Sequence, residues 1–193
     1  MAPALYQGHI RKLWLNDQGE FRDHLLRLDA DTRRRRFGMI ATDDFVQRYV
    51  GTSFNLDSVI HGCFIDGTLR GVGELRILND KRTEAEAAFC VEPTWQGGGI
   101  GTALMQHTLV TARNRGVAKM YMSCLASNRS MQRLAAAHGA SLEFEGGEVI
   151  GIVLPPDPSV FSVSREAVWD SEGWATAMFD LHRRYLGVQV ARG

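Results

Sequence analysis

The sequence predicts one α/β domain, with a mixed, mostly antiparallel sheet of about seven strands flanked by helices, followed by a helical C-terminal extension. Three observations lead to this prediction. The chain has 193 residues, which suits one domain rather than two full-sized ones. Apolar patterns with strand and helix periods follow one another along residues 10–154. Three prolines between positions 155 and 158 then mark a boundary, which divides the chain into residues 1–154 and 155–193.

The N-terminal part predicts one strand and two helices. Residues 10–15 are typical of a short strand. Asp17 and Glu20 have the spacing of a capping pair, so we expect a helix there with Phe21 on its buried side. Thr42 is placed to cap a second helix. Both helices are expected to face the core.

Three strands come next. Residues 59–65 and 69–78 are apolar runs separated by an Asp-Gly pair, which is typical of a tight hairpin. Residues 84–91 form a further strand that ends before Pro93, because proline cannot continue a central ladder. An antiparallel unit is therefore expected in the middle of the chain.

The second half of the domain alternates helices and strands. Residues 99–115 predict a helix with two apolar sides, so it should be covered twice. A strand at 117–125 and a helix at 128–138 follow, and strands at 141–144 and 149–154 complete the domain.

The extension predicts a helix over residues 164–186. Trp174, Met178, Leu181 and Tyr185 are spaced as one stripe. Such a segment cannot be a domain alone, so the stripe should pack on the main body or on a second subunit. A homodimer therefore remains open.

The charge balance excludes a strongly basic or acidic partner for the whole chain. Lys plus Arg and Asp plus Glu both number 22, so we expect neither nucleic acid nor a membrane surface as partner. The one basic run, at residues 33–36, has acidic neighbours. It is typical of a solvated helix, with a groove for acidic partners or coenzyme A phosphates as the alternative.

Cysteine usage indicates a reducing compartment. Cys63, Cys90 and Cys124 lie far apart and show no paired spacing, which argues against a disulfide framework and against a metal site. The first residues lack the apolar core of a signal peptide, and no uncharged run is long enough to span a membrane. We therefore expect a cytoplasmic protein.

The most informative segment is the glycine-rich turn at residues 96–101, which reads Gln-Gly-Gly-Gly-Ile-Gly. It follows a strand and opens a helix, where unpaired backbone N–H groups converge at the positive end of the helix dipole. Glycine allows positive φ and a close approach of the backbone to a ligand. The turn predicts a phosphate-binding site, with a merely tight turn as the plain alternative.

The spacing argues against two common phosphate sites. A Walker-type loop needs lysine before its serine or threonine, whereas Gly101 precedes Thr102 here. A dinucleotide-binding turn normally follows the first strand of a parallel unit, whereas this turn follows an antiparallel hairpin.

These residues resemble the GNAT superfamily of N-acetyltransferases, whose signature is Gln or Arg, two variable residues, Gly, one variable residue, and Gly or Ala. Gln96, Gly99 and Gly101 fill that signature. Residues 91–104, and the later segment that begins at Asn128, also look like this family. The resemblance covers roughly residues 8–154 and is nearest to the acetyltransferase domain of bacterial Pat-type protein lysine acetyltransferases.

The resemblance implies acetyl-CoA as cosubstrate, with its pyrophosphate on the glycine turn and its pantetheine arm along the preceding strand. Asn128 would bond that arm, although it also suits a plain N-cap. The implied cofactor-binding residues are Phe89, Cys90, Val91, Gln96, Gly97, Gly98, Gly99, Ile100, Gly101, Thr102 and Asn128.

The reaction implied is direct attack of a primary amine on the thioester in a ternary complex. An amine with a pKa near 10.4 is mostly protonated at neutral pH, so the reaction benefits from a base. Glu86, on the strand that leads to the turn, is the first candidate, and Glu74 on the preceding strand is the second. Either carboxylate could instead be a solvent-facing strand residue.

One position departs from the family pattern. Many relatives carry a tyrosine about seven residues after the asparagine, and this chain has Ala135 there. The group that protonates the leaving thiolate is therefore unassigned. Tyr121, Cys124, Ser127 and Ser130 are near in sequence, and water is sufficient for a weakly basic thiolate. Cys124 as a covalent nucleophile is weighed against a buried core cysteine.

The acceptor stays open between a small-molecule amine and a protein lysine, because the recognised motifs shape the fold and the cofactor site rather than the acceptor pocket. A non-catalytic acyl-CoA-binding module is the alternative to an enzyme, and Ala135 is the feature that keeps it open.

Overall fold

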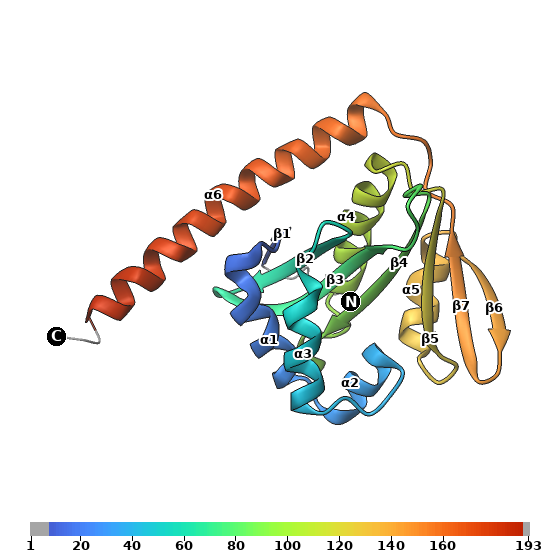
Figure 1. The fold of residues 1–193 in the computed structure, drawn as a ribbon, viewed down its shortest axis with the longest axis horizontal. Coiled ribbons are helices and arrows are strands. Elements are labelled where there is room, and N and C mark those ends of the chain that lie inside the picture. The colour runs from blue at the N-terminus through green and yellow to red at the C-terminus, as the bar shows by residue number, and fades with distance from the viewer. Residues whose placement is uncertain (1–7, 191–193) are drawn as a thin grey trace.

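The computed structural model describes residues 8–190, and the side chains of its last helix up to residue 178. A seven-stranded sheet runs through the molecule in the order β1-β2-β3-β4-β5-β7-β6 (Figure 1). The predicted fold class, a mostly antiparallel sheet with flanking helices and a C-terminal helix, is confirmed. The strands are β1 (His9–Lys12), β2 (Ser58–Ile65), β3 (Thr68–Ile77), β4 (Glu84–Val91), β5 (Lys119–Leu125), β6 (Ser141–Glu145) and β7 (Glu148–Val153).

Helices lie between these strands and after them. They are α1 (Gln18–Arg27), α2 (Ala30–Phe37), α3 (Asp43–Ser53), α4 (Ile100–Asn114), α5 (Arg129–Ala137) and α6 (Val160–Val190), with 3₁₀ turns η1 (Leu15–Asp17) and η2 (Pro93–Trp95). Helix α4 contacts β2, β3 and β4 and also α5 and α6, so its predicted double covering is confirmed.

The segment before β2 differs from the prediction. Three helices separate β1 from β2, because Asp29 starts a helix of its own: its carboxylate accepts a hydrogen bond from the Thr32 N–H at 2.7 Å. The first strand also ends at Lys12 rather than at residue 15. The Asp17 carboxylate accepts from the Trp14 N–H at 2.9 Å and from Arg11, which turns the chain and replaces the expected capping bond.

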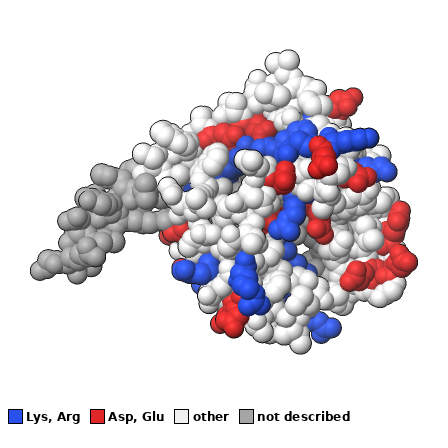
Figure 2. Space-filling model, viewed as in Figure 1, with Lys and Arg blue, Asp and Glu red and all other residues white. Residues whose placement is uncertain are grey.

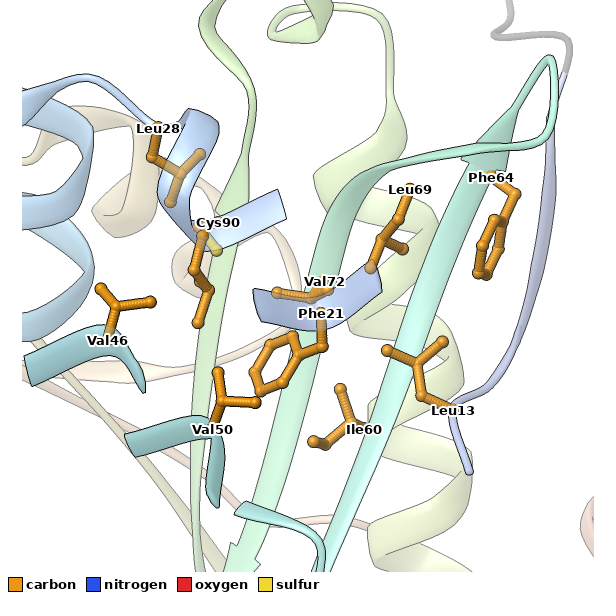
Figure 3. Close-up of a cluster of buried hydrophobic side chains, with 11 residues drawn as sticks. Leu13, Phe21, Leu28, Val46, Val50, Ile60, Phe64, Leu69, Val72 and Cys90 are labelled. Atoms are coloured by element: carbon orange, nitrogen blue, oxygen red, sulfur yellow. The ribbon is translucent and has the colours of Figure 1, made fainter. Parts of the chain in front are cut away.

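Two apolar layers hold the helices on the sheet. One cluster contains Phe21 and Leu25 of α1, Val46 and Val50 of α3, and facing strand residues such as Val72 (Figure 3). The other places α4 and α5 against β3, β4, β5 and β7, with Met105, Met120 and Met122 fully buried. Burial of this kind contributes roughly 1.5–3 kcal/mol for each large side chain.

One feature of the sheet positions the site. All neighbouring strands are antiparallel except β4 and β5, which pair in parallel at only three positions, from Glu84 with Lys119 to Glu86 with Tyr121. Strand β4 continues to Val91 and β5 to Leu125, so the two strands separate after Glu86. The sheet therefore opens between them on the side that leads to the glycine turn.

Helix α6 is longer than predicted and runs from the body as an extended arm (Figure 1). Its first half contacts β1 and α4. Trp174 and Met178 of the predicted stripe are 60% and 49% exposed, so they do not pack on the main body. Leu181 and Tyr185 lie outside the side chains that the structure describes.

Candidate active site

The glycine turn has the backbone geometry that requires glycine. Gly97 and Gly99 have φ values of +80° and +91°, in the left-handed region that side chains disfavour. Gly99 is the N-cap of α4, so the first N–H groups of that helix have no side-chain cap from this residue. The Gln96 side chain donates to the Val91 carbonyl at 2.9 Å and ties the turn to β4. The turn thus presents backbone donors at the positive end of a helix.

A cleft of about 510 Å³ opens in front of this turn. Its size is in the range of sites that enclose a cofactor or a small ligand. Five segments form it: α2, the end of β4, the turn with the start of α4, the 3₁₀ turn η2, and α5. The lining from β4 to α4 is Phe89, Cys90, Val91, Trp95, Gln96, Gly97, Gly99, Ile100, Gly101 and Thr102.

The structure brings nearly all cofactor candidates together in this cleft. Within the described part of the chain, Gly98 is the one candidate that does not line it. Asn128 lines the cleft and is also the N-cap of α5, because its Oδ1 atom accepts from the Met131 N–H at 3.2 Å. The capping role of Asn128 is thus observed, whereas its bond to the pantetheine arm stays a prediction.

The α5 wall follows a helical stripe. Ser130, Met131, Leu134 and Ala137 line the cleft at the spacing of one helix face, with Arg133 beside them. Ala135 does not line the cleft: it is 2% exposed and packs against β7 near Gly151. The residue seven positions after Asn128 therefore faces the core. Ser130 is the hydroxyl that α5 contributes to the cleft.

Helix α2 supplies a further wall, which the sequence offered only as the alternative interpretation of the basic run at residues 33–36. Thr32, Arg35 and Arg36 all line the cleft. The arginines of the run at 33–36 thus point in different directions. Arg33 does not line the cleft and instead donates a hydrogen bond to the Leu26 carbonyl at 2.6 Å. If the helix start at Asp29 had been recognised, the helical spacing of residues 33–36 would have predicted which of these side chains face the cleft.

Beside the cleft lies a buried cluster around Glu74. Its carboxylate, 3% exposed, accepts from Arg36 at 2.8 Å, from Arg76 at 3.1 Å and from the Tyr49 hydroxyl. Burial, together with the nearby Glu74 carboxylate, raises the pKa of Tyr49 to about 12, so the phenol stays protonated and donates. Both carboxylate oxygens of Glu74 are thus already engaged by neighbouring side chains.

Glu86 has a different environment. It is exposed and lies on β4 opposite Arg76 of β3 and Tyr121 of β5, at the last position where β4 and β5 pair. Its side chain shares a strand face with Ala88 and Cys90, because residues two apart point the same way. An exposed carboxylate at the point where the strands separate is free to meet an incoming ligand.

A second network supports the cleft wall from behind. His24 of α1 lies 3.3 Å from the Glu92 carboxylate and 3.6 Å from the Cys90 sulfur. Arg27 and Arg70 each donate to Glu92 at 2.8 Å. Burial alone would raise the pKa of Glu92, but these hydrogen bonds outweigh it and lower the pKa to about 2.

The thiols near the cleft are poor nucleophiles. Burial raises the pKa of Cys90 to about 12 and also raises the pKa of Cys124, which is 8% exposed. Both are therefore protonated at neutral pH. Tyr121 contacts Glu84 through its hydroxyl at 3.3 Å.

Acidic and basic side chains are interspersed over the visible face of the molecule (Figure 2). Among the helices that the structure describes, none is long and apolar enough to cross a membrane. In the same residues, no group of three or more His, Cys, Asp or Glu side chains is placed to hold a metal ion.

This chain is similar to known proteins in its sequence and in its fold. Residues 22–140 match the model of the acetyltransferase (GNAT) family. An acetyltransferase of Pseudomonas aeruginosa is 31% identical over 138 residues, which is 67% of this chain and 73% of that protein.

Solved structures share the fold. The GNAT domain of S. lividans PAT superposes with a TM-score of 0.69 at 21% identity, over 76% of this chain and 90% of that domain. Spermidine N-acetyltransferase from Vibrio cholerae, solved with CoA and spermine, gives a TM-score of 0.61 at 19% identity, over 77% and 96% of the two chains. The acetyltransferase yncA from Salmonella typhimurium, solved with acetyl-CoA, gives 0.58 at 16% identity, over 80% and 97%.

Proposed function

The chain belongs to the GNAT family of acetyltransferases, and from that premise we propose that it transfers an acetyl group from acetyl-CoA to a primary amine by direct attack in a ternary complex. The observation that carries the proposal is the cleft that runs from the glycine turn to the part of β4, Phe89 to Val91, that has no β5 partner. The glycine turn suits a diphosphate, and Glu86, which is not among the lining residues, lies exposed three positions before Phe89 on the same strand.

The residues present fit acetyl-CoA. A Cβ atom built on Gly97 or Gly99 would meet nothing within 4 Å, so the space beside the turn is open to a ligand. Arg35 and Arg133 line the same cleft and add positive charge for phosphate groups. The edge of β4 from Phe89 to Val91 has no β5 partner in the ladder, which leaves backbone groups for the amides of the pantetheine arm.

The chemical step needs a neutral amine and a place for its proton. In the proposed reaction the amine nitrogen attacks the thioester carbon, the C–S bond breaks, and coenzyme A leaves as its thiolate. Glu86 takes the amine proton, directly or through water, because it is exposed at the end of the β4–β5 ladder. Glu74 is the weaker candidate, since its oxygens are held by Arg36, Arg76 and Tyr49.

Two classes of acetyl acceptor are proposed, a small-molecule amine and a protein lysine. Relatives of this fold include a spermidine N-acetyltransferase and the GNAT domain of PAT, and their likeness to this chain supports the fold alone. The Glu74 cluster contains two guanidinium groups for one carboxylate, so it does not favour a polycation at that point.

A non-catalytic acyl-CoA-binding module is the second candidate. It is favoured by one observation: position 135 is an alanine that faces β7, so α5 supplies no tyrosine hydroxyl there. Ser130, which lines the cleft, or water would then have to protonate the thiolate.

One experiment separates the two. Release of coenzyme A thiol is measured with acetyl-CoA, a panel of small amines and a lysine peptide, alongside calorimetry of acetyl-CoA binding. An N-acetyltransferase releases thiol in step with one class of acceptor. Saturable acetyl-CoA binding without turnover on the panel supports the binding module, and the lack of any acyl-CoA binding would overturn both.

A further inference from the structure

Helix α6 presents two different faces along its length. One face is docked on the domain: Ser162 is buried, and Glu166 accepts from Lys12 at 2.7 Å and from Asn114 at 2.6 Å. Further along, Gly173 lies so close to β1 that a Cβ there would be 2.8 Å from the Cβ of Arg11. This face explains how the helix is held, and it uses mainly polar contacts.

A second face is apolar and open to solvent. Val160 is 85% exposed, Trp174 60% and Met178 49%. Trp174 follows Gly173 directly, so this face lies roughly 100° round the helix from the docked one. The two faces therefore do not compete for the same partner.

The exposed residues of this face belong to a seven-residue repeat that continues in the sequence to residue 188. The repeat is Val160, Ala167, Trp174, Leu181 and Val188, and the positions four residues after each of the first four are Ser164, Ser171, Met178 and Tyr185. Alternating steps of four and three residues are the spacing of a helix seam that packs on another helix. The domain does not cover this seam at Val160, Trp174 or Met178.

We propose that a second copy of this chain covers the seam, with the two α6 helices side by side and antiparallel. The seam is complementary to itself in one antiparallel register. In that register Trp174 lies opposite Met178 of the second copy. In the amino-acid sequence, this register sets positions 181, 185 and 188, which hold larger residue types, against Ser171, Ala167 and Ser164. Pairing large with small positions fills such an interface.

Backbone approach favours the same register. Ala175 and Ala177 flank the two-fold axis, where small side chains allow the helices to approach closely. A parallel pair would instead place tryptophan against tryptophan and serine against serine. An antiparallel two-fold pair also keeps the two domains at opposite ends.

The first test is the oligomeric state of the full chain by sedimentation. The wild type is expected to be a dimer, and Trp174→Glu should raise its dissociation constant roughly 100-fold, as for a buried interface tryptophan. Leu56→Glu is the matched control, because Leu56 is 95% exposed on another surface and undergoes the same kind of change. A monomeric wild type, or a dimer that Trp174→Glu leaves intact, overturns the proposal.

The second test uses disulfide cross-linking to determine the register of the two α6 helices. Ala177→Cys places a thiol beside the proposed axis, so it should form an intermolecular disulfide under mild oxidation, whereas Ala167→Cys should not. Cys63, Cys90 and Cys124 are buried and give little background. Cross-linking of both variants indicates parallel helices and overturns the proposed register, as does cross-linking of Ala167→Cys alone or of neither.

This proposal stands apart from the proposed function. The residues that line the cleft come from α2, β4, η2, α4 and α5 and not from α6, so acetyl-CoA binding by Trp174→Glu should equal that of the wild type. Calorimetry on the same samples distinguishes a failed dimer from a failed cofactor site.

Discussion

The glycine turn and the Glu74 cluster beside the cleft are built from different parts of the chain. At the glycine turn the groups that face the cleft are backbone amides within six consecutive residues, fixed by positive φ at Gly97 and Gly99. The Glu74 cluster consists of side chains from α2, α3 and β3, of which Arg36 lines the cleft, and Arg36 and Glu74 are separated by 38 positions in sequence. The turn depends on local conformation, whereas the cluster depends on packing of the whole domain.

This difference has a consequence for substitutions. A change at the turn should act on the cofactor with a limited effect on the fold, because the turn is exposed and lies beyond the end of β4. A change in the Glu74 cluster should act on stability first, since breaking a buried ion pair costs about 3–5 kcal/mol. The predictions below test this division, beginning with the largest effect.

Gly99→Glu should reduce acetyl-CoA affinity by roughly 100-fold or more, because it places a negative charge against the diphosphate. The matched control is Gly116→Glu at the other end of α4. Gly116 also has positive φ, at +73°, and open space around its Cβ position. Both variants should lose about 1–2 kcal/mol of stability from backbone strain. Calorimetry that shows equal affinity for the two variants would contradict the phosphate site.

Glu86→Gln should lower the rate about a hundredfold at neutral pH and less at alkaline pH, where the amine is already deprotonated. Glu84→Gln, two residues earlier on β4, serves as the control and should keep its activity. The measurement is kcat/KM across the pH range. A uniform loss at every pH would assign Glu86 a role other than base.

Asn128 tests whether one side chain serves both the helix and the cofactor. Asn128→Ser should keep the melting temperature, because serine is an equally good N-cap, but should weaken acetyl-CoA binding about tenfold through loss of the amide. Asn128→Ala should lose about 1 kcal/mol of stability as well. If the serine variant binds acetyl-CoA as tightly as the wild type, the capping role is sufficient.

The docked face of α6 should show the smallest effect, visible only in acid. Burial would raise the pKa of Glu166, but hydrogen bonds from Lys12 and Asn114 outweigh it and lower the pKa to about 2. The unfolded chain therefore takes up this proton first, and stability should fall as the pH drops from about 4.5 to about 2.

His107, which stacks on Trp169 of α6, adds a second pH range over which stability should change. Burial lowers the pKa of His107 to about 4, so its contribution should be lost between about pH 6.5 and 4. In urea unfolding at a series of pH values, Glu166→Gln should flatten the lower range and keep the upper one, which should extend slightly further into acid because the Glu166 charge raises the pKa of His107. A variant with both ranges unchanged would show that Glu166 does not hold the helix.

The difference between local conformation and packing of distant residues also explains which features could be predicted from the sequence. The turn at residues 96–101 and the Asp-Gly hairpin were predicted correctly because each is a local conformation with its own residue requirements, and Asp66 and Gly67 do have positive φ. Strand β4 was predicted with its observed bounds because Pro93 ends it. Local signals of this kind need no knowledge of distant contacts.

The parts that were missed depend on contacts between distant residues or on side chains that could be read in two ways. Asp29 was not recognised as the start of α2, so the arginines after it could not be assigned directions. The hydrogen bonds that Arg36 and Tyr49 donate to Glu74 join three elements, and no periodic pattern in the sequence indicates them. The roles of Glu86 and Glu74 in catalysis stay predictions.

The seven-stranded sheet has two free edges, and the chain protects them by different means. At one edge α6 lies against β1, which covers a row of backbone groups that could otherwise recruit a strand from another molecule. At the other edge β6 carries the exposed carboxylates of Glu143 and Glu145, which repel a like strand. Removal of residues 155–193 would therefore uncover only the β1 edge, and the expected product is a protein that aggregates by sheet extension.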